Sequence, residues 1–274
     1  MKLAFSTLGC PEWNLEQIMA TAHANGFTGI EVRGIEGAME PEGIVCLQPA
    51  NRENTLQAMK EHGLAFCVFG TSVHFHDPET VEQDYQKALE IMRFCSECGI
   101  PMMRIFGNEV KPETETAQLD QIADCFERLS QEGEKLNVRP LLEVHGNLTT
   151  IERLRYVAER VKSPAFGIIW DVGHTHVHYG AEFETFYRAL KPWICHVHMK
   201  DAIHENGKQH HLCLIGEGHL PLRGIVEMLE KDGYQGYYSL EWEKRWHPEL
   251  AEPEIAIPGY AAWMNRGESY EMCK

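Results

Sequence analysis

Eight short apolar runs alternate with eight amphipathic stretches along the chain. The apolar runs read KLAFST (2–7), GIEVRG (29–34), LAFCVFG (64–70), PMMRIFG (101–107), RPLLEVHG (139–146), AFGIIWDVG (165–173), WICHVHMKD (193–201) and GYYSLEWE (236–243). Stretches with helical spacing come after them at 12–25, 50–63, 78–98, 115–136, 149–162, 181–190, 221–232 and 259–266. Strands that alternate strictly with helices are typical of a parallel α/β fold.

This alternation predicts an α/β protein that forms one (β/α)₈ TIM barrel over residues 1–274. Such a barrel commonly takes about 250 residues, and no linker or shift in composition divides the chain. A doubly wound sheet is the alternative. It is disfavoured because no G-x-G-x-x-G follows the first strand and no phosphate-binding G-x-x-x-x-G-K-[ST] is present.

Charge and the start of the chain limit the classes of partner. The chain carries 41 acidic and 25 basic residues, for a net charge of -16. Nucleic-acid binding depends on Lys and Arg, so we expect no nucleic-acid partner. MKLAFSTLGCPEW reads as a first strand rather than a signal peptide, because Gly9 and Pro11 interrupt its apolar run. No run reaches the length of a membrane span, so we expect a cytoplasmic protein.

Four consecutive strand-like runs end in a carboxylate or an imidazole. These groups are Glu143, Asp171, His198 and Glu241. An ionised side chain after a buried run is costly unless a partner compensates it. The active sites of TIM barrels lie at the carboxyl ends of the strands. The four residues therefore predict a common site at that end of the barrel.

The two-residue period of a strand predicts that all four face the barrel axis. It groups Leu141 with Glu143 and His145, Ile169 with Asp171, Ile194 with His196, His198 and Lys200, and Tyr237 with Ser239, Glu241 and Glu243. A divalent cation would offset the repulsion among three carboxylates. Three such oxygens and one imidazole suit Mn²⁺, which we favour, or Mg²⁺, with Co²⁺ and Zn²⁺ as alternatives.

Several weaker candidates surround this set. His145 and Lys200 face inward by the same period, and Arg104 lies on the fourth strand, so we expect all three to contact substrate. The alternatives are a packed or metal-supporting histidine for His145 and an ordinary polar residue at a strand end for Arg104. For Lys200 the alternative is an ion pair with Glu243. The glycines of IGEGH (215–219) predict a tight turn, with an anion-binding turn as the alternative.

The order and spacing of these motifs resemble the xylose-isomerase-like barrel superfamily, in particular its sugar phosphate isomerase/epimerase branch. The resemblance runs through GFTGIEVR, LLEVHGN, WDVGH, HVHMKD and IGEGHLPLRGIVEMLEKDGYQGYYSLEWE, over nearly the whole chain. The metal set of that branch implies that Glu143, Asp171, His198 and Glu241 bind the metal. The branch's His-x-Lys-Asp pattern selects His198 over His196.

The resemblance also implies a reaction. Glu143 and Glu241 would take and return the proton next to a substrate carbonyl, through an enediolate. His174 would contact substrate oxygens and stabilise the developing oxyanion. The expected function is a divalent-metal-dependent isomerase or epimerase of a sugar, sugar phosphate or polyol. The resemblance also allows a homo-oligomer.

Two other activities stay open on the same scaffold. One is a metal-dependent dehydratase of the inosose or dehydroshikimate type, in which a β hydroxyl leaves after the same proton is removed. The other is an apurinic-site endonuclease, which shares Asp-x-x-His. That family needs a further His on the fourth strand, where MMRIFGN has none.

Overall fold

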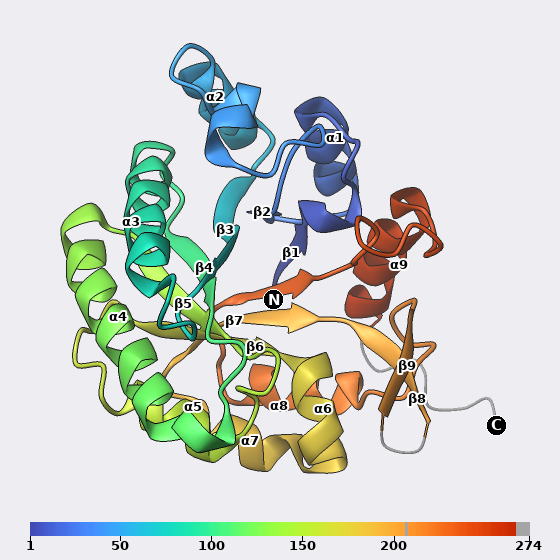
Figure 1. The fold of residues 1–274 in the computed structure, drawn as a ribbon. Helices are drawn as coiled ribbons and strands as arrows, with labels where there is room; N and C mark the ends of the chain where they lie inside the picture. The colour runs from blue at the N-terminus through green and yellow to red at the C-terminus, as the bar shows by residue number, and fades with distance from the viewer. Residues whose placement is uncertain (206–207, 267–274) are drawn as a thin grey trace.

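Eight parallel strands close into a barrel (Figure 1). The computed structural model describes residues 1–205 and 208–266. In sequence the barrel strands are β1 (Lys2–Ser6), β2 (Gly29–Val32), β3 (Ala65–His74), β4 (Met102–Phe106), β5 (Arg139–Glu143), β6 (Gly167–Asp171), β7 (Ile194–Met199) and β10 (Tyr237–Leu240). β10 pairs with both β1 and β7, which completes the ring. The predicted TIM barrel is confirmed.

Helices surround the barrel, as Figure 1 shows. They are α1 (Leu15–Ala24), α2 (Arg52–Glu61), α3 (Val81–Glu97), α4 (Glu115–Leu136), α5 (Ile151–Ala158), α6 (Val172–Tyr179), α7 (Phe183–Leu190), α8 (Leu222–Lys231) and α9 (Pro253–Asn265). Polar caps fix several of their starts: the side chains of Asn14 and Thr150 accept hydrogen bonds from the first turns of α1 and α5. The residues of α4 match the predicted stretch 115–136.

The core has two layers that correspond to the two faces of the strands. A large cluster lies between strands and helices, and a small one fills the inside of the barrel. The inner cluster consists of Ala4, Cys67, Val68, Leu141 and Ile169. Leu141 and Ile169 therefore face the axis, as predicted, and Glu143 and Asp171 come next on the same face. The apolar filling ends where the charged residues begin.

One prediction from the strand period is wrong. The period places Ile194 on the same face as His196, but Ile194 belongs to the outer cluster. Ile168 pairs with Ile194 while Ile169 pairs with His196, so β7 holds one extra residue at this point. Such a bulge shifts the alternation by one. Cys195 packs against the inner cluster instead.

Two elements go beyond the eight predicted units. Residues 172–179, directly after β6, form the additional helix α6. An antiparallel hairpin of β8 (Asp201–Glu205) and β9 (Lys208–Cys213) comes directly after β7. In Figure 1 this hairpin projects from the barrel on the side of α9.

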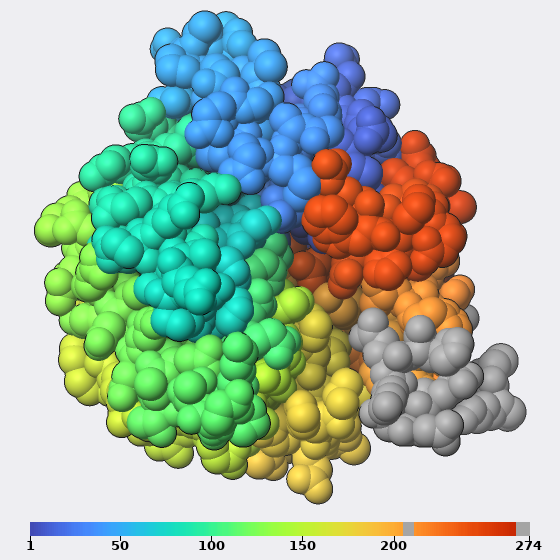
Figure 2. All heavy atoms as spheres, in the orientation of Figure 1, coloured from blue at the N-terminus to red at the C-terminus, as the bar shows by residue number. Residues whose placement is uncertain are grey.

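The last helix packs beside the first elements of the chain. The ring of Tyr260 in α9 stacks on Phe27, with centroids 6.1 Å apart, and its hydroxyl donates a hydrogen bond to the carbonyl of Tyr238. The blue and red surfaces accordingly meet in Figure 2. The helix begins at Pro253, earlier than the predicted 259. Among the described residues, no helix combines the length and apolarity needed to cross a membrane.

Candidate metal centre and cavity

The four predicted ligands come together at the carboxyl ends of neighbouring strands. β5 ends at Glu143 and β6 at Asp171, His198 lies near the end of β7, and Glu241 comes directly after β10. Each offers one ligand atom, and these atoms lie within 4.8 Å of one another. All four residues are buried. Because β5, β6, β7 and β10 are adjacent in the barrel, the topology itself brings these residues together.

Two buried cations contact these carboxylates. Nη1 of Arg104 lies 3.0 Å from Oε2 of Glu143 and 3.3 Å from Oε1 of Glu241. Nζ of Lys200 lies 2.9 Å from Oδ2 of Asp171 and 2.6 Å from Oε2 of Glu241. Lys200 also pairs with Glu243 at 2.8 Å, so both roles considered for it are compatible with its position.

The charges around each group set its protonation. Burial alone would raise the pKa of Glu241, but His198 and Lys200 outweigh it and hold this pKa well below the ordinary value. Burial likewise opposes ionisation of Glu143, and Arg104 holds its pKa below the ordinary value. Burial would lower the pKa of Lys200, but Asp171 and Glu241 raise it well above the usual range. These two carboxylates are therefore ionised and the ammonium is protonated at neutral pH.

The donor set fits a divalent cation. Three buried atoms of the cluster have a charged neighbour within 3.3 Å but make no hydrogen bond of proper geometry: Oε2 of Glu143, Oδ2 of Asp171 and Nδ1 of His198. Buried polar atoms without such a partner are rare in proteins. Carboxylate oxygens and an imidazole nitrogen are ligands shared by magnesium, manganese, cobalt and zinc. This donor set does not single out manganese.

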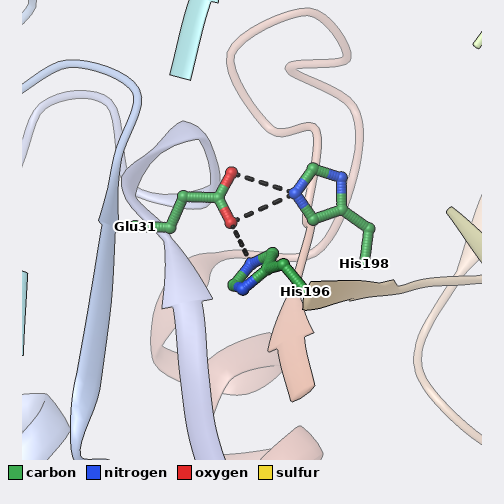
Figure 3. A group of neighbouring side chains, drawn as sticks. All are labelled: Glu31, His196 and His198. Carbon is green, nitrogen blue, oxygen red and sulfur yellow. Dashed lines mark hydrogen bonds and ion pairs between the residues drawn. The ribbon is translucent and has the colours of Figure 1, made fainter. Parts of the chain in front are cut away.

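Glu31, which the sequence pattern did not single out, contacts His198 on the side of the ring that faces away from the carboxylate cluster. Its carboxylate on β2 lies 3.1 Å from Nε2 of His198 and 2.9 Å from Nε2 of His196 (Figure 3). It also accepts a 2.9 Å hydrogen bond from Ser239. When the His198 ring donates Nε2–H to Glu31, its Nδ1 faces the carboxylates of Glu143, Asp171 and Glu241. Nδ1 of His198 indeed lies 3.3 Å from Oε2 of Glu241.

Both histidines also act on Glu31. Burial would raise its pKa, but His198 and His196 outweigh burial and hold the pKa far below the ordinary value. A signal for this residue was present in the sequence. Glu31 is an acidic residue between the apolar residues Ile30 and Val32 of a strand, just as Asp171 is an acidic residue directly after an apolar run.

Asp171 has a second contact that positions His174. Its Oδ1 accepts a 2.9 Å hydrogen bond from the backbone N–H of His174, which makes Asp171 the N-cap of α6. The His174 ring packs against His145 with centroids 4.4 Å apart. Nδ1 of His145 lies 2.9 Å from Oδ1 of Asn108. The predicted substrate residues His174 and His145 thus lie side by side.

A cavity of about 310 Å³ opens over the cluster. The predicted residues Glu143, Glu241, His145, His174, Arg104 and Lys200 line it, together with Arg33, Ser72, Glu243 and Trp246. A larger cavity of about 660 Å³ lies elsewhere, between the loop after β9 and α9. Of these two, the smaller one is bordered by the carboxylate cluster, so we place the substrate there.

The glycine turn of IGEGH serves the fold rather than a free anion. The buried carboxylate of Asp201 accepts hydrogen bonds from the backbone N–H groups of Gly216 and Gly218, both at 2.9 Å. It also accepts from Ala202 at 2.9 Å and Leu220 at 3.2 Å. A Cβ on Gly218 would lie 2.1 Å from this carboxylate, which explains the glycine. The prediction of a tight turn is confirmed.

We expect Asp201→Asn to destabilise the protein by roughly 2–4 kcal/mol, because an amide NH₂ would face backbone donors. Urea unfolding followed by circular dichroism measures the change. Asp124→Asn, on the exposed face of α4, is the matched control and should have a small effect. Equal stability of the two variants would contradict the role given to Asp201.

Comparison with known proteins agrees with this architecture. The model of the family described as xylose isomerase-like TIM barrel matches residues 19–265. The chain belongs to the xylose isomerase-like TIM barrel family. It is 24% identical over 278 residues to an inosose dehydratase of Serratia proteamaculans (strain 568), covering 90% of this chain and 88% of that protein.

Solved structures share the fold at low sequence identity. The probable 3-DHS dehydratase AsbF from Bacillus anthracis has a TM-score of 0.78 and 18% identity, over 97% of this chain and 100% of that one. The 3-keto-D-glucoside 4-epimerase YcjR from E. coli has a TM-score of 0.73 and 19% identity, over 96% and 98%. The barrel is thus shared with both dehydratases and epimerases.

Proposed function

We propose that this protein is a divalent-metal-dependent enzyme that removes the proton next to a carbonyl group of a sugar- or polyol-derived substrate. The observation that carries the proposal is the buried cluster of Glu143, Asp171, His198 and Glu241 beneath a cavity. A divalent ion bound by these residues supplies Lewis-acid polarisation of the carbonyl. An apurinic-site endonuclease is not favoured, because β4 contributes Arg104 and no histidine to this cavity.

The side chains of the cavity supply the remaining chemistry. Glu143 and Glu241 are ionised and border the cavity, so either can accept a proton from the substrate. His174 and His145 line the same cavity and are placed to donate hydrogen bonds to substrate oxygens. Lys200 stays protonated and stabilises negative charge that develops there.

Dehydration is the outcome that the relatives favour. The inosose dehydratase matches this chain over most of its length, and AsbF is a probable 3-DHS dehydratase. In such a reaction one carboxylate removes the α proton, an acidic group donates a proton to the β hydroxyl, and this hydroxyl leaves as water.

Epimerisation is the second candidate, and the pairing of two glutamates supports it. Arg104 contacts both Glu143 and Glu241, so two ionised carboxylates border one cavity. An epimerase needs one carboxylate to take the proton from one face and a second carboxylate, which has first taken up a proton, to deliver that proton to the other face.

The reaction can be assigned in D₂O. The protein, loaded with Mg²⁺ or Mn²⁺, would be incubated with inososes, 3-dehydroshikimate and keto-sugars, and the products read by NMR and mass spectrometry. Loss of water identifies a dehydratase, and deuterium at the α carbon without loss of water identifies an epimerase or isomerase. A metal-loaded protein that produces neither change in any substrate would contradict the proposal.

A further inference from the structure

Arg33 is a buried cation on the wall of the cavity. It comes directly after β2, and only 5% of its surface is exposed. Its Nη2 donates a 2.6 Å hydrogen bond to Oγ of Ser72, which also lines the cavity. Its backbone N–H donates to Oγ1 of Thr7 at 2.9 Å, which fixes the start of the side chain.

Arg33 differs from the other two cations of the cavity in its partners. Arg104 and Lys200 each contact at least two carboxylates. In the described part of the chain, no carboxylate lies within ion-pair distance of Arg33; Glu40 and Glu143 act on it only from further away. Burial, with Arg104 and Arg245 nearby, lowers the pKa of Arg33 to about 10. A buried charge without a counter-ion is costly.

A glycine makes room for this charge. Gly70 on β3 lies close to both arginines: a Cβ there would be 2.9 Å from Cδ of Arg33 and 3.6 Å from Cζ of Arg104. A residue with a side chain would push Arg33 away from the cavity wall. The side chains of Arg33 and Arg104 therefore both pass close to one glycine, although their charges repel each other.

We propose that Arg33 binds a carboxylate group of the substrate, so that the enzyme acts on hydroxy acids rather than on neutral sugars. This inference rests on the proposed function only in taking the same cavity as the substrate site. A planar guanidinium matches a carboxylate in two-point geometry. A phosphate group carries a charge of about -2 and would lie near Glu143, Glu241 and Glu243. Arg33, the one cation of the cavity that lacks a counter-ion, would neutralise only one of these negative charges.

Ligand-induced stabilisation tests the assignment without turnover. Thermal unfolding of the Mg²⁺-loaded protein would be measured with shikimate against methyl shikimate, D-glucuronate against D-glucose, and glucose 6-phosphate, at equal ionic strength. We expect at least one acid to raise the midpoint and to bind about tenfold more tightly than its neutral partner by titration calorimetry. Arg33→Gln should abolish this difference, and Arg33→Lys should restore part of it.

A second arginine provides the control. Arg245→Gln removes the same charge from a neighbouring loop and should leave the preference for the acid intact. The inference is overturned if no acid is preferred, if Arg33→Gln keeps the preference, or if glucose 6-phosphate alone binds. None of these results bears on proton abstraction, which is tested separately by deuterium incorporation.

Discussion

Glu143→Gln is expected to lower turnover of the substrate by roughly two to four orders of magnitude. The amide has the shape of the carboxylate but accepts no proton, and a positioned acid–base group contributes a factor of this size. Because Arg104 keeps its contact with Glu241 in this variant, we expect the barrel to stay folded. Steady-state kinetics with a substrate identified in D₂O measures the loss, and circular dichroism checks the fold.

Glu241→Gln distinguishes the two candidate reactions. In an epimerase both glutamates transfer a proton during the reaction, so this variant should lose turnover as severely as Glu143→Gln. In a dehydratase with a single base, one of the two variants should still exchange the α proton with solvent. Glu113→Gln, at an exposed position, is the control and should keep full activity. Full activity of both active-site variants would remove the glutamates from the mechanism.

Glu31→Gln is expected to weaken binding of the divalent metal by about 10- to 100-fold. Groups that orient a metal-binding histidine have effects of this size. A carboxylate accepts hydrogen bonds from His196, His198 and Ser239 together, whereas an amide offers a single acceptor oxygen. The ring of His198 then loses its fixed orientation. Competition with a coloured chelator measures the affinity.

Glu243→Gln is the matched control for this experiment. It also removes one negative charge near the cluster, but Glu243 contacts Lys200 and not His198. We expect its metal affinity to fall only a few-fold. If Glu31→Gln and Glu243→Gln behave alike, the effect is one of charge and not of histidine orientation.

The sequence predicted the barrel because its signals repeat and agree. Eight apolar runs at regular spacing leave few arrangements, and parallel strands place their carboxyl ends together. The sequence alone groups Glu143, Asp171, His198 and Glu241, since each lies at or near the carboxyl end of its own strand. The structure brings them together; their role as metal ligands stays a prediction.

Other features depend on contacts that one strand does not reveal. The partners of Glu31 and Arg33 lie on other strands: His198 on β7 contacts Glu31, and Ser72 on the neighbouring strand β3 contacts Arg33. The bulge at Cys195 depends on pairing with β6. The hairpin of β8 and β9 was not predicted, because its strands have only a weak apolar pattern.

The contact between Asp171 and the backbone of His174 has a consequence for how relatives can diverge. The three-residue interval is the reach of a capping side chain into the first turn of a helix, so it is set by backbone geometry and not by the substrate. An insertion or deletion between the two would misplace both at once. In a redesign of the substrate specificity of this barrel, the segment after α6 can be replaced, but Asp171 and His174 must be kept together at their present spacing.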